Sequence, residues 1–504
     1  MDTDLNFIKE TDRELELISR IKAQLEWDQE TCLPSGGVKE RSDQLSYLEG
    51  KLYDLLSDSE FGKRLEHVQQ NFLENSSNIG AERDVALVRE LLFRHRRIAK
   101  LPKALVQNIA KQSSINQLSW YSAKLNSDFS KFSPDLKETI KLLQNKIECI
   151  GYTNEKYDAL LQEYEPGMQT KDLSLLFEAL VPQLVDIVEL IKSSKEKIST
   201  DFLGLYYSEP GQRWYSERLL ELVGFDHKRG RLDVSKHPFS TLLGNSDVRV
   251  TTRFNENFLC SSLFGTLHEA GHGMYDLGHD SDLFNTGLSG GASLGIHESQ
   301  SRFWENIIGR SYDFWMFSYP ELQNTFPENL AQISLNEFYR AINRVQFTPI
   351  RVEADEVTYN LHIALRFQLE RELVENNLLV DDLLEAWRVL SKEYLFIDSI
   401  NDSSGVLQDI HWPLFYFGYF PTYTLGNLYS AQFYKKMSSD LPDLKSQIQQ
   451  GNFKNILKWL RVNIHAKGKI YNANDLCLKV TQKELDSKFY LIYLQEKYSE
   501  LYGI

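Results

Sequence analysis

The most constraining feature of this chain is a five-residue segment near its middle, His268-Glu269-Ala270-Gly271-His272. Two histidines four positions apart on a helix are separated by about 400° of rotation and about 6 Å along the axis, so they share one face. Both imidazoles can then reach one zinc ion, and Glu269 is close enough to hold a water that the metal also binds. The pattern predicts a hydrolytic zinc site with two ligands and a general base. An ordinary amphipathic helix can also carry these residues by chance, and the other features of the chain argue against that alternative.

A catalytic zinc ion takes three protein ligands and keeps one position open for water. The extended pattern H-E-x-x-H-x-x-G-x-x-H requires a glycine at 275 and a histidine at 278, but the chain has tyrosine and glycine there, and His279 is one residue out of place. The other common arrangement takes a glutamate from a later helix. Glu298 begins a predicted helix over 298–308, after a glycine-rich turn. It is the preferred third ligand, and Glu305 is the alternative.

Three neighbours of these ligands also carry information. His297 precedes Glu298, and adjacent residues on a helix diverge by about 100°, so both cannot face one ion. We expect His297 to line the cleft or to hydrogen-bond a group behind the ligands. Gly271 and Gly273 flank His272, although each glycine costs a helix about 1 kcal/mol. Close backbone approach beside a metal site would explain why they are tolerated.

The composition excludes several classes of protein. The chain has 71 acidic and 56 basic residues, a formal net charge of −15, which disfavours a sequence-independent nucleic-acid binder. The cysteines are far apart and form no C-x-x-C pair, which indicates neither a thiolate zinc site nor a dense disulfide framework. The first residues are acidic rather than apolar, and no apolar run approaches the length of a membrane span. We therefore expect a protein that has no signal peptide, makes no membrane contact and is cytoplasmic.

The hydrophobic periodicity is helical over most of the chain. The predicted helices span 5–27, 38–56, 82–99, 103–125, 134–150, 171–198, 212–223, 335–346, 351–375 and 381–396. Ser133 is the expected N-cap of the fifth of these helices, and Gly151 is expected to close it. Residues 247–254 alternate, are rich in β-branched side chains and form the one clear strand prediction.

No linker clearly divides the chain. We therefore expect a single, mostly helical domain over 1–504, with a small sheet in its cleft. Its helical N-terminal part would cover about 1–200, its catalytic part about 201–435, and its C-terminal helices 436–504.

Three more motifs accompany the H-E-x-x-H segment and the later His297-Glu298-Ser299. They are D-x-R-x-T (Asp247, Arg249, Thr251), I-R-x-x-A-D (Ile350, Arg351, Ala354, Asp355) and G-x-x-Q-D-x-H-W (Gly405, Gln408, Asp409, His411, Trp412). In this order, over nearly the whole chain, they resemble the carboxypeptidase Taq family of zinc metallocarboxypeptidases. The resemblance implies an almost all-helical body with a long narrow cleft, similar to neurolysin and angiotensin-converting enzyme. It also implies a homodimer that removes single C-terminal residues from peptides with broad side-chain preference.

The chemistry suggests a role for each candidate residue. His268, His272 and Glu298 would hold Zn²⁺, although Co²⁺ or Mn²⁺ could occupy the same site. Glu269 would take a proton from the metal-bound water and pass it to the leaving amine. The tetrahedral oxyanion needs a donor besides the metal, and Tyr423 and His237 are the candidates. For either one, a purely structural place remains the alternative.

A carboxypeptidase must also recognise a free α-carboxylate, and the planar fork of arginine suits that task. Arg351 is the first choice and Arg249 the second. The alternative is that each pairs with a structural acid, such as Asp355 for Arg351 or Asp247 for Arg249.

Three further residues, Gln408, Asp409 and His411, are expected to form a polar wall of the cleft or to support other site residues. Two other functions remain open. One is an endo-oligopeptidase or dipeptidyl carboxypeptidase on the same scaffold. The other is a non-catalytic peptide-binding protein, against which the intact Glu269 and ligand set argue.

Overall fold

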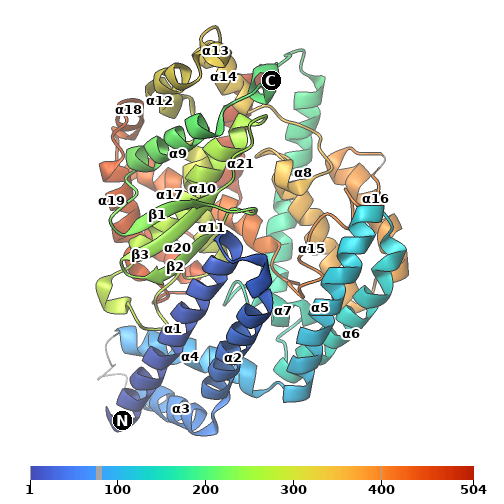
Figure 1. Cartoon of the computed structure of the whole chain (residues 1–504), viewed down its shortest axis with the longest axis vertical. Coiled ribbons are helices and arrows are strands. Elements are labelled where there is room, and N and C mark those ends of the chain that lie inside the picture. Colours follow the sequence, from blue (N-terminus) through green and yellow to red (C-terminus); the bar gives the residue numbers. More distant parts are fainter. Residues whose placement is uncertain (1, 75–81, 399) are drawn as a thin grey trace. The chain divides into compact units, whose positions relative to one another are not determined.

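The structure is a computed structural model that describes residues 2–74, 82–398 and 400–504 (Figure 1). The chain folds into two compact units, each built from separate stretches of sequence. The first unit comprises Met1–Ala99, Ile198–Ile342 and Ser430–Glu484, and the second comprises Lys100–Lys197, Asn343–Tyr429 and Leu485–Ile504. The predicted mostly helical fold with one small sheet is confirmed. The single-domain organisation stays a prediction.

The first unit carries a sheet and most of the helices. Its helices are α1 (Asp2–Thr31), α2 (Val38–Ser57), α3 (Ser59–Glu74), α4 (Glu82–Ala99), α9 (Glu209–Val223), α10 (Leu259–Leu277), α11 (Leu294–Arg302), α12 (Tyr312–Thr325), α13 (Pro327–Leu330), α14 (Leu335–Ile342), α18 (Leu444–Gln449), α19 (Lys454–Asn463) and α20 (Ala473–Thr481). The helices of the second unit are α5 (Lys103–Asn126), α6 (Ser133–Ile150), α7 (Lys156–Leu161), α8 (Thr170–Ser193), α15 (Tyr359–Glu375), α16 (Leu383–Leu395) and α21 (Lys488–Tyr502). Helix α17 (Pro421–Asp440) contributes residues to both units.

Several predicted helix ends were wrong, and local hydrogen bonds explain two of them. The helix that carries Glu298 begins at Leu294, because the Ser293 hydroxyl accepts a bond from the Ile296 amide and caps it. Residues 351–358 are not α-helical: a 3₁₀ turn is followed by Asp355, whose carboxylate accepts from the amides of residues 357 and 358. Helix α15 therefore starts only at Tyr359.

Other differences are smaller. Ser133 is the first residue of α6 rather than its N-cap, and Gly151 closes that helix with a positive φ of 83°, as predicted. Helix α1 continues to Thr31 instead of ending at 27. The predicted helices over 171–198 and 335–346 end early, at Ser193 and Ile342.

The sheet has three strands, β1 (Gly230–Val234), β2 (Ser240–Gly244) and β3 (Asp247–Thr252), in the order β1-β3-β2. The predicted strand is the central one; β1 runs parallel to it and β2 antiparallel. Val248 and Val250 are fully buried. A Cβ atom at Gly273 of α10 would lie 2.8 Å from Val250, so α10 packs closely on β3 (Figure 1).

The connection between α10 and α11 is anchored in the first unit. The core of α1 to α4 includes Leu283 and Leu288, which belong to this connection. Asp12 of α1 accepts the Gly287 amide with both carboxylate oxygens, at 3.0 and 2.9 Å. The N-terminal helices therefore support the segment that joins the two histidines to Glu298. Of the helices that the structure describes, none combines the length and apolarity needed to cross a membrane.

Candidate metal centre

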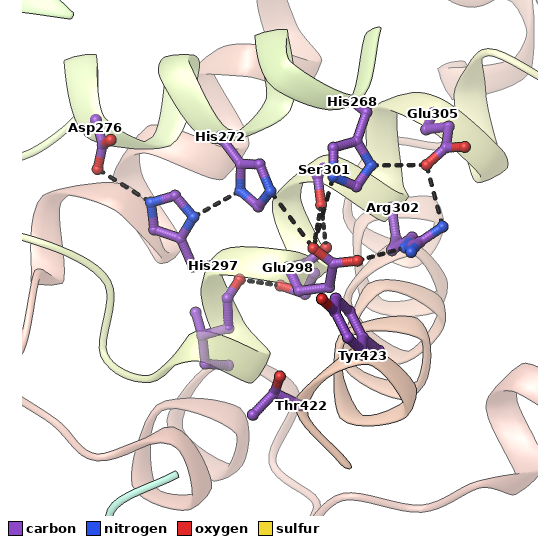
Figure 2. A network of polar contacts seen from close by, with 12 residues as sticks. His268, His272, Asp276, His297, Glu298, Ser301, Arg302, Glu305, Thr422 and Tyr423 are labelled. Atoms are coloured by element: carbon purple, nitrogen blue, oxygen red, sulfur yellow. Dashed lines mark hydrogen bonds and ion pairs between the residues drawn. The ribbon is translucent and has the colours of Figure 1, made fainter. Parts of the chain in front are cut away.

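The candidate centre forms where α10 and α11 approach each other. A Cβ atom at Gly271 would meet the Gln300 carbonyl oxygen and would lie 2.6 Å from the Ser301 Cα atom. Only glycine allows this distance between the two backbones. The close backbone approach expected beside the metal site is found at Gly271, and it brings Glu298 of α11 opposite the histidines of α10 (Figure 2). Gly273 instead faces side chains, those of Val250 and Phe225, so the expectation was wrong for this glycine.

Three side chains converge on one point. The donor atoms of His268, His272 and Glu298 all lie within 4.8 Å of one another. Glu298 Oε2 is 3.4 Å from His272 Nε2 and 3.7 Å from His268 Nε2. A tetrahedral ion with ligand bonds of about 2.0–2.1 Å sets its donor atoms about 3.3 Å apart, so the spacing fits such an ion. Two imidazoles and one carboxylate are also a donor set that zinc prefers.

Each histidine is oriented through its other ring nitrogen. His268 Nδ1 lies 2.8 Å from Glu305 Oε2, and His272 Nδ1 lies 2.6 Å from His297 Nδ1. His297 in turn reaches Asp276 through its Nε2, at 3.3 Å. This arrangement leaves both Nε2 atoms facing Glu298. In metal sites, a partner at the other ring nitrogen fixes the tautomer of a ligand histidine in this way.

Glu269 lies on α10 between the two histidines and is 6% exposed. Its Oε2 atom is buried and has no hydrogen-bond partner among the described residues. A buried carboxylate oxygen without a partner is costly, so a ligand or water is expected there. Burial, together with the nearby Glu298 and Glu305, raises the pKa of Glu269 to about 7.

The carboxylates and imidazoles of the centre shift one another's pKa values. Burial by itself would raise the pKa of Glu298, but Arg302 and the two histidines hold it well below its usual range. Burial and the neighbouring His297 lower the pKa of His272 to about 4. Burial opposes charge on His268 as well, yet the nearby Glu298 and Glu305 raise its pKa to about 9. The carboxylates thus favour the charged form of His268, whereas His272 stays neutral, the form in which an imidazole binds a metal.

Sequence reasoning did not identify Arg302, Ser301 and Asp276. The Nε atom of Arg302 donates to Glu298 Oε1 at 2.6 Å, and the Ser301 hydroxyl donates to Glu298 Oε2 at 3.1 Å. A signal was present for two of them, because Asp276 follows His272 by four residues and Arg302 follows Glu298 by four. Glu305, weighed as an alternative ligand, bonds instead to the rear nitrogen of His268.

Comparison with known proteins identifies the family. Residues 7–498 match the carboxypeptidase Taq (M32) metallopeptidase family. The chain belongs to this family. It is 38% identical over 503 residues to thermostable carboxypeptidase 1 of Thermus thermophilus (98% of each chain) and 37% identical over 484 residues to carboxypeptidase 1 of Bacillus subtilis (96% of each).

Solved structures agree with this assignment. The crystal structure of an M32 carboxypeptidase from Deinococcus radiodurans covers all of both chains at 35% identity, with a TM-score of 0.94. A Pyrococcus furiosus carboxypeptidase covers 98% of this chain and 99% of its own, at 36% identity and the same TM-score. The resemblance inferred from the motifs is confirmed, and the protein is a metallocarboxypeptidase that acts on peptides with the help of a metal ion.

Two other candidate site residues, Arg249 and His237, lie in the first unit. Arg249 of β3 donates from Nε and from Nη2 to the two carboxylate oxygens of Asp247, each at 3.0 Å, and its guanidinium lies over the Trp27 ring. Arg249 therefore pairs with a structural acid, which was the alternative to binding the substrate carboxylate. His237 is exposed in the segment between β1 and β2, and its carbonyl accepts from the Ser235 hydroxyl.

The second unit holds a buried charge cluster. Arg351 donates from Nε and Nη2 to Asp409 Oδ1, at 3.0 and 2.7 Å, and from Nη1 to the Tyr359 hydroxyl. Arg366 reaches the other oxygen of Asp409 at 2.7 Å. The acid that pairs with Arg351 is thus Asp409, not Asp355. Burial would raise the pKa of Asp409, but the two arginines hold it well below its usual range.

The remaining candidates surround this cluster. Gln408 Oε1 accepts the Arg351 amide at 2.8 Å, and its amide nitrogen donates to the carbonyls of residues 349 and 404. His411 Nε2 lies 3.2 Å from the Tyr423 hydroxyl, and its ring stacks on Phe420. Burial lowers the pKa of His411 to about 3, so it is a neutral partner for the tyrosine.

Proposed function

We propose that this metallocarboxypeptidase uses zinc and hydrolyses the C-terminal peptide bond of peptides with broad side-chain preference. The observation that carries the proposal is the convergence of His268, His272 and Glu298 donor atoms within 4.8 Å, beside the unpartnered buried oxygen of Glu269. The breadth of preference is what the family resemblance implies. Co²⁺ or Mn²⁺ remain alternative occupants of the same ligands.

In this proposal Glu269 is the general base. Bound zinc would lower the pKa of a water and polarise the scissile carbonyl. Glu269 would accept one proton from that water, and the resulting hydroxide oxygen would form a bond to the carbonyl carbon. When the C–N bond breaks, Glu269 would return the proton to the leaving amine. Burial raises the pKa of this carboxylate above its ordinary value, which suits a group that must both accept and release a proton.

Recognition of the free C-terminal carboxylate is assigned to Arg351. Two arginines share one aspartate in its cluster, so Arg351, Arg366 and Asp409 carry a net charge of +1. A guanidinium has five N–H groups, and Arg351 uses three, which leaves two for a ligand. Arg249 is the second candidate, because it pairs with Asp247 one to one and the pair carries no net charge.

The remaining assignments concern the oxyanion and the support of Arg351. Tyr423 is a candidate oxyanion donor whose hydroxyl has His411 as a neighbour, and His237 is the exposed alternative. Gln408 and Asp409 would hold Arg351 in place. A homodimer, which the family resemblance implies, and a cytoplasmic location complete the proposal.

A mixed peptide digest tests the reaction directly. Mass spectrometry before and after incubation should show peptides shortened by single C-terminal residues, with little regard to the residue lost. A chelator should stop this, and added zinc should restore it. Matched peptides with free or amidated C-termini then separate the alternatives: equal cleavage of both, or internal cuts, would favour an endo-oligopeptidase and would remove the role of Arg351.

The Glu269→Gln variant tests the general base. The amide cannot accept the proton, and general-base catalysis contributes about 10²–10⁴ in rate, so release of C-terminal residues should fall by at least that range. Metal content, measured by elemental analysis, should stay near one ion per chain. Undiminished turnover in a metal-loaded variant would remove Glu269 from this role.

A further inference from the structure

The two oxygens of Glu298 have different surroundings. Oε2 faces the Nε2 atoms of His272 and His268, at 3.4 and 3.7 Å. Oε1 instead accepts a short bond of 2.6 Å from the Nε atom of Arg302. Charge-assisted bonds of this length are roughly twice as strong as neutral ones. Oε2 also accepts the Ser301 hydroxyl at 3.1 Å, but of the two oxygens it is the one that faces the histidine nitrogens.

Arg302 also connects Glu298 to the back of His268. Its Nη1 atom donates to Glu305 Oε2 at 3.2 Å, and the same oxygen lies 2.8 Å from His268 Nδ1 (Figure 2). The contacts form a chain from His268 through Glu305 and Arg302 to Glu298. All four side chains are at most one-fifth exposed. Two prospective ligands are thus held by one guanidinium and one carboxylate.

The spacing of these residues explains why one arginine can do this. Glu298, Arg302 and Glu305 lie at i, i+4 and i+7, which places them on one helical face. Arg302 ends α11, and Glu305 lies in the π-helical turn Phe303–Ile308 that follows. The planar fork of arginine can bridge two carboxylates, whereas a lysine ammonium is a single point of charge.

We propose that Arg302 is a positioning residue that keeps Glu298 a one-oxygen ligand and thereby biases the centre toward a small four-coordinate ion over cations that prefer six ligands. A carboxylate with both oxygens free can bind an ion through both and raise its coordination number. Zinc takes four ligands, and manganese suits sites with more oxygen donors. The inference rests on the proposed metal centre, and it assigns the choice of metal to a residue that does not touch the metal.

Cobalt is the probe for this proposal, because Co²⁺ absorbs visible light strongly in four-coordinate sites and weakly in six-coordinate ones. Apoprotein would be loaded with Co²⁺ for the wild type, Arg302→Gln, Arg302→Lys and the control Arg213→Gln. The control removes an exposed arginine that also follows its glutamate, Glu209, by four residues. Zinc and manganese affinities would be measured on the same proteins by competition with a chelator.

The wild type and the control should show the intense spectrum and a strong preference for zinc. In Arg302→Gln the visible absorption should fall several-fold. Its zinc affinity should drop by about 10–100-fold, as expected for loss of a partner behind a ligand, while manganese affinity falls less. Arg302→Lys keeps the charge but not the bridge, so it should lie between the two and should also serve if the glutamine variant does not fold.

Two results would overturn the inference. If both Arg302 variants keep the wild-type cobalt spectrum and the wild-type ratio of zinc to manganese affinity, Arg302 only stabilises its helix. If the wild type itself takes up no cobalt, or takes it up equally after His268→Ala, the metal centre of the proposed function fails, and the inference fails with it. The first result leaves the proposed function intact, so the two failures are distinguishable.

Discussion

Gly271 shows how a single residue decides whether this centre can form. Its missing side chain lets the backbone of α10 approach that of α11, where a Cβ atom would lie 2.6 Å from the Ser301 Cα atom. The atoms that this Cβ would meet belong to the backbone of Gln300 and Ser301, and backbone cannot rotate away as a flexible side chain can. The helical cost of about 1 kcal/mol for the glycine is therefore offset by the contact that brings Glu298 to the histidines.

Gly271→Ala should accordingly weaken both the fold and the metal centre. Overpacking of this kind costs about 1–3 kcal/mol, so the melting temperature of the apoprotein should fall, and zinc affinity should fall with it. The matched control is Gly265→Ala on the same helix, whose Cβ atom would meet only Thr252 Oγ1 at an ordinary 3.7 Å. The control should be neutral or more stable. Equal melting temperatures and zinc affinities for the two variants would contradict the importance of the close approach.

At the same scale, the limits of sequence reasoning follow from distance along the chain. Relations four residues apart, such as His268 with His272, are fixed by helix geometry and could be predicted. The contact of Glu298 with the histidines required a family resemblance or an assumption, because Glu298 follows His272 by 26 residues and no α-helix spans residues 278–293 between them. The partner of Arg351 was harder still: Asp355 is near in sequence, but Asp409 is near in space.

The helices could be predicted better than the elements that join them. The predicted bounds of α2, α4 and α5 agree with the observed ones to within two residues. Helix α4 buries one continuous face that includes Val88, Leu91 and Leu92. Strands β1 and β2 were missed, because five-residue segments with mixed polarity carry little periodic signal. The start of α15 depends on the Asp355 side chain, a detail that periodicity does not contain.

The connection between α10 and α11 gives an element-level prediction. Asp12 holds the Gly287 amide, is 1% exposed, and burial raises its pKa to about 7. The nearby Glu16 favours the neutral form, and Arg94 opposes it. Because the folded chain keeps a proton that the unfolded chain has already lost, stability falls as pH rises from about 4 to about 7. Above pH 7 the loss is complete.

Asp12→Asn removes this titration while keeping an oxygen that can accept the Gly287 amide. From pH 5.5 to pH 8 the free energy of unfolding of the variant should rise by about 2 kcal/mol relative to that of the wild type. The wild type loses about 1.4 kcal/mol per pH unit over the roughly 1.5 units that lie between pH 5.5 and the pKa of Asp12. Thermal unfolding of both proteins at the two pH values measures the difference. A stability difference independent of pH would mean that Asp12 is ionised in the fold at both.

At the scale of the whole chain, the candidate residues divide between the two units. The donor atoms of the metal group and Glu269 belong to the first unit, whereas Arg351, Asp409, His411 and Tyr423 belong to the second. The proposed chemistry and the proposed recognition of the substrate carboxylate therefore depend on different packing cores. Loss of the metal should therefore disorder the first unit far more than the second.

Hydrogen–deuterium exchange of the zinc-loaded and chelator-treated protein tests this division. Without zinc, the electrostatic attraction that joins α10 to α11 is lost, so peptides from these helices and from residues 278–293 should exchange faster. Peptides from α8 and α16 of the second unit should change little, because among the described residues the three-donor group lies wholly within the first. Glu298→Ala, treated with zinc and with chelator, should show no such difference. A uniform increase across both units on metal removal would instead mean that the ion stabilises the two cores as one cooperative structure.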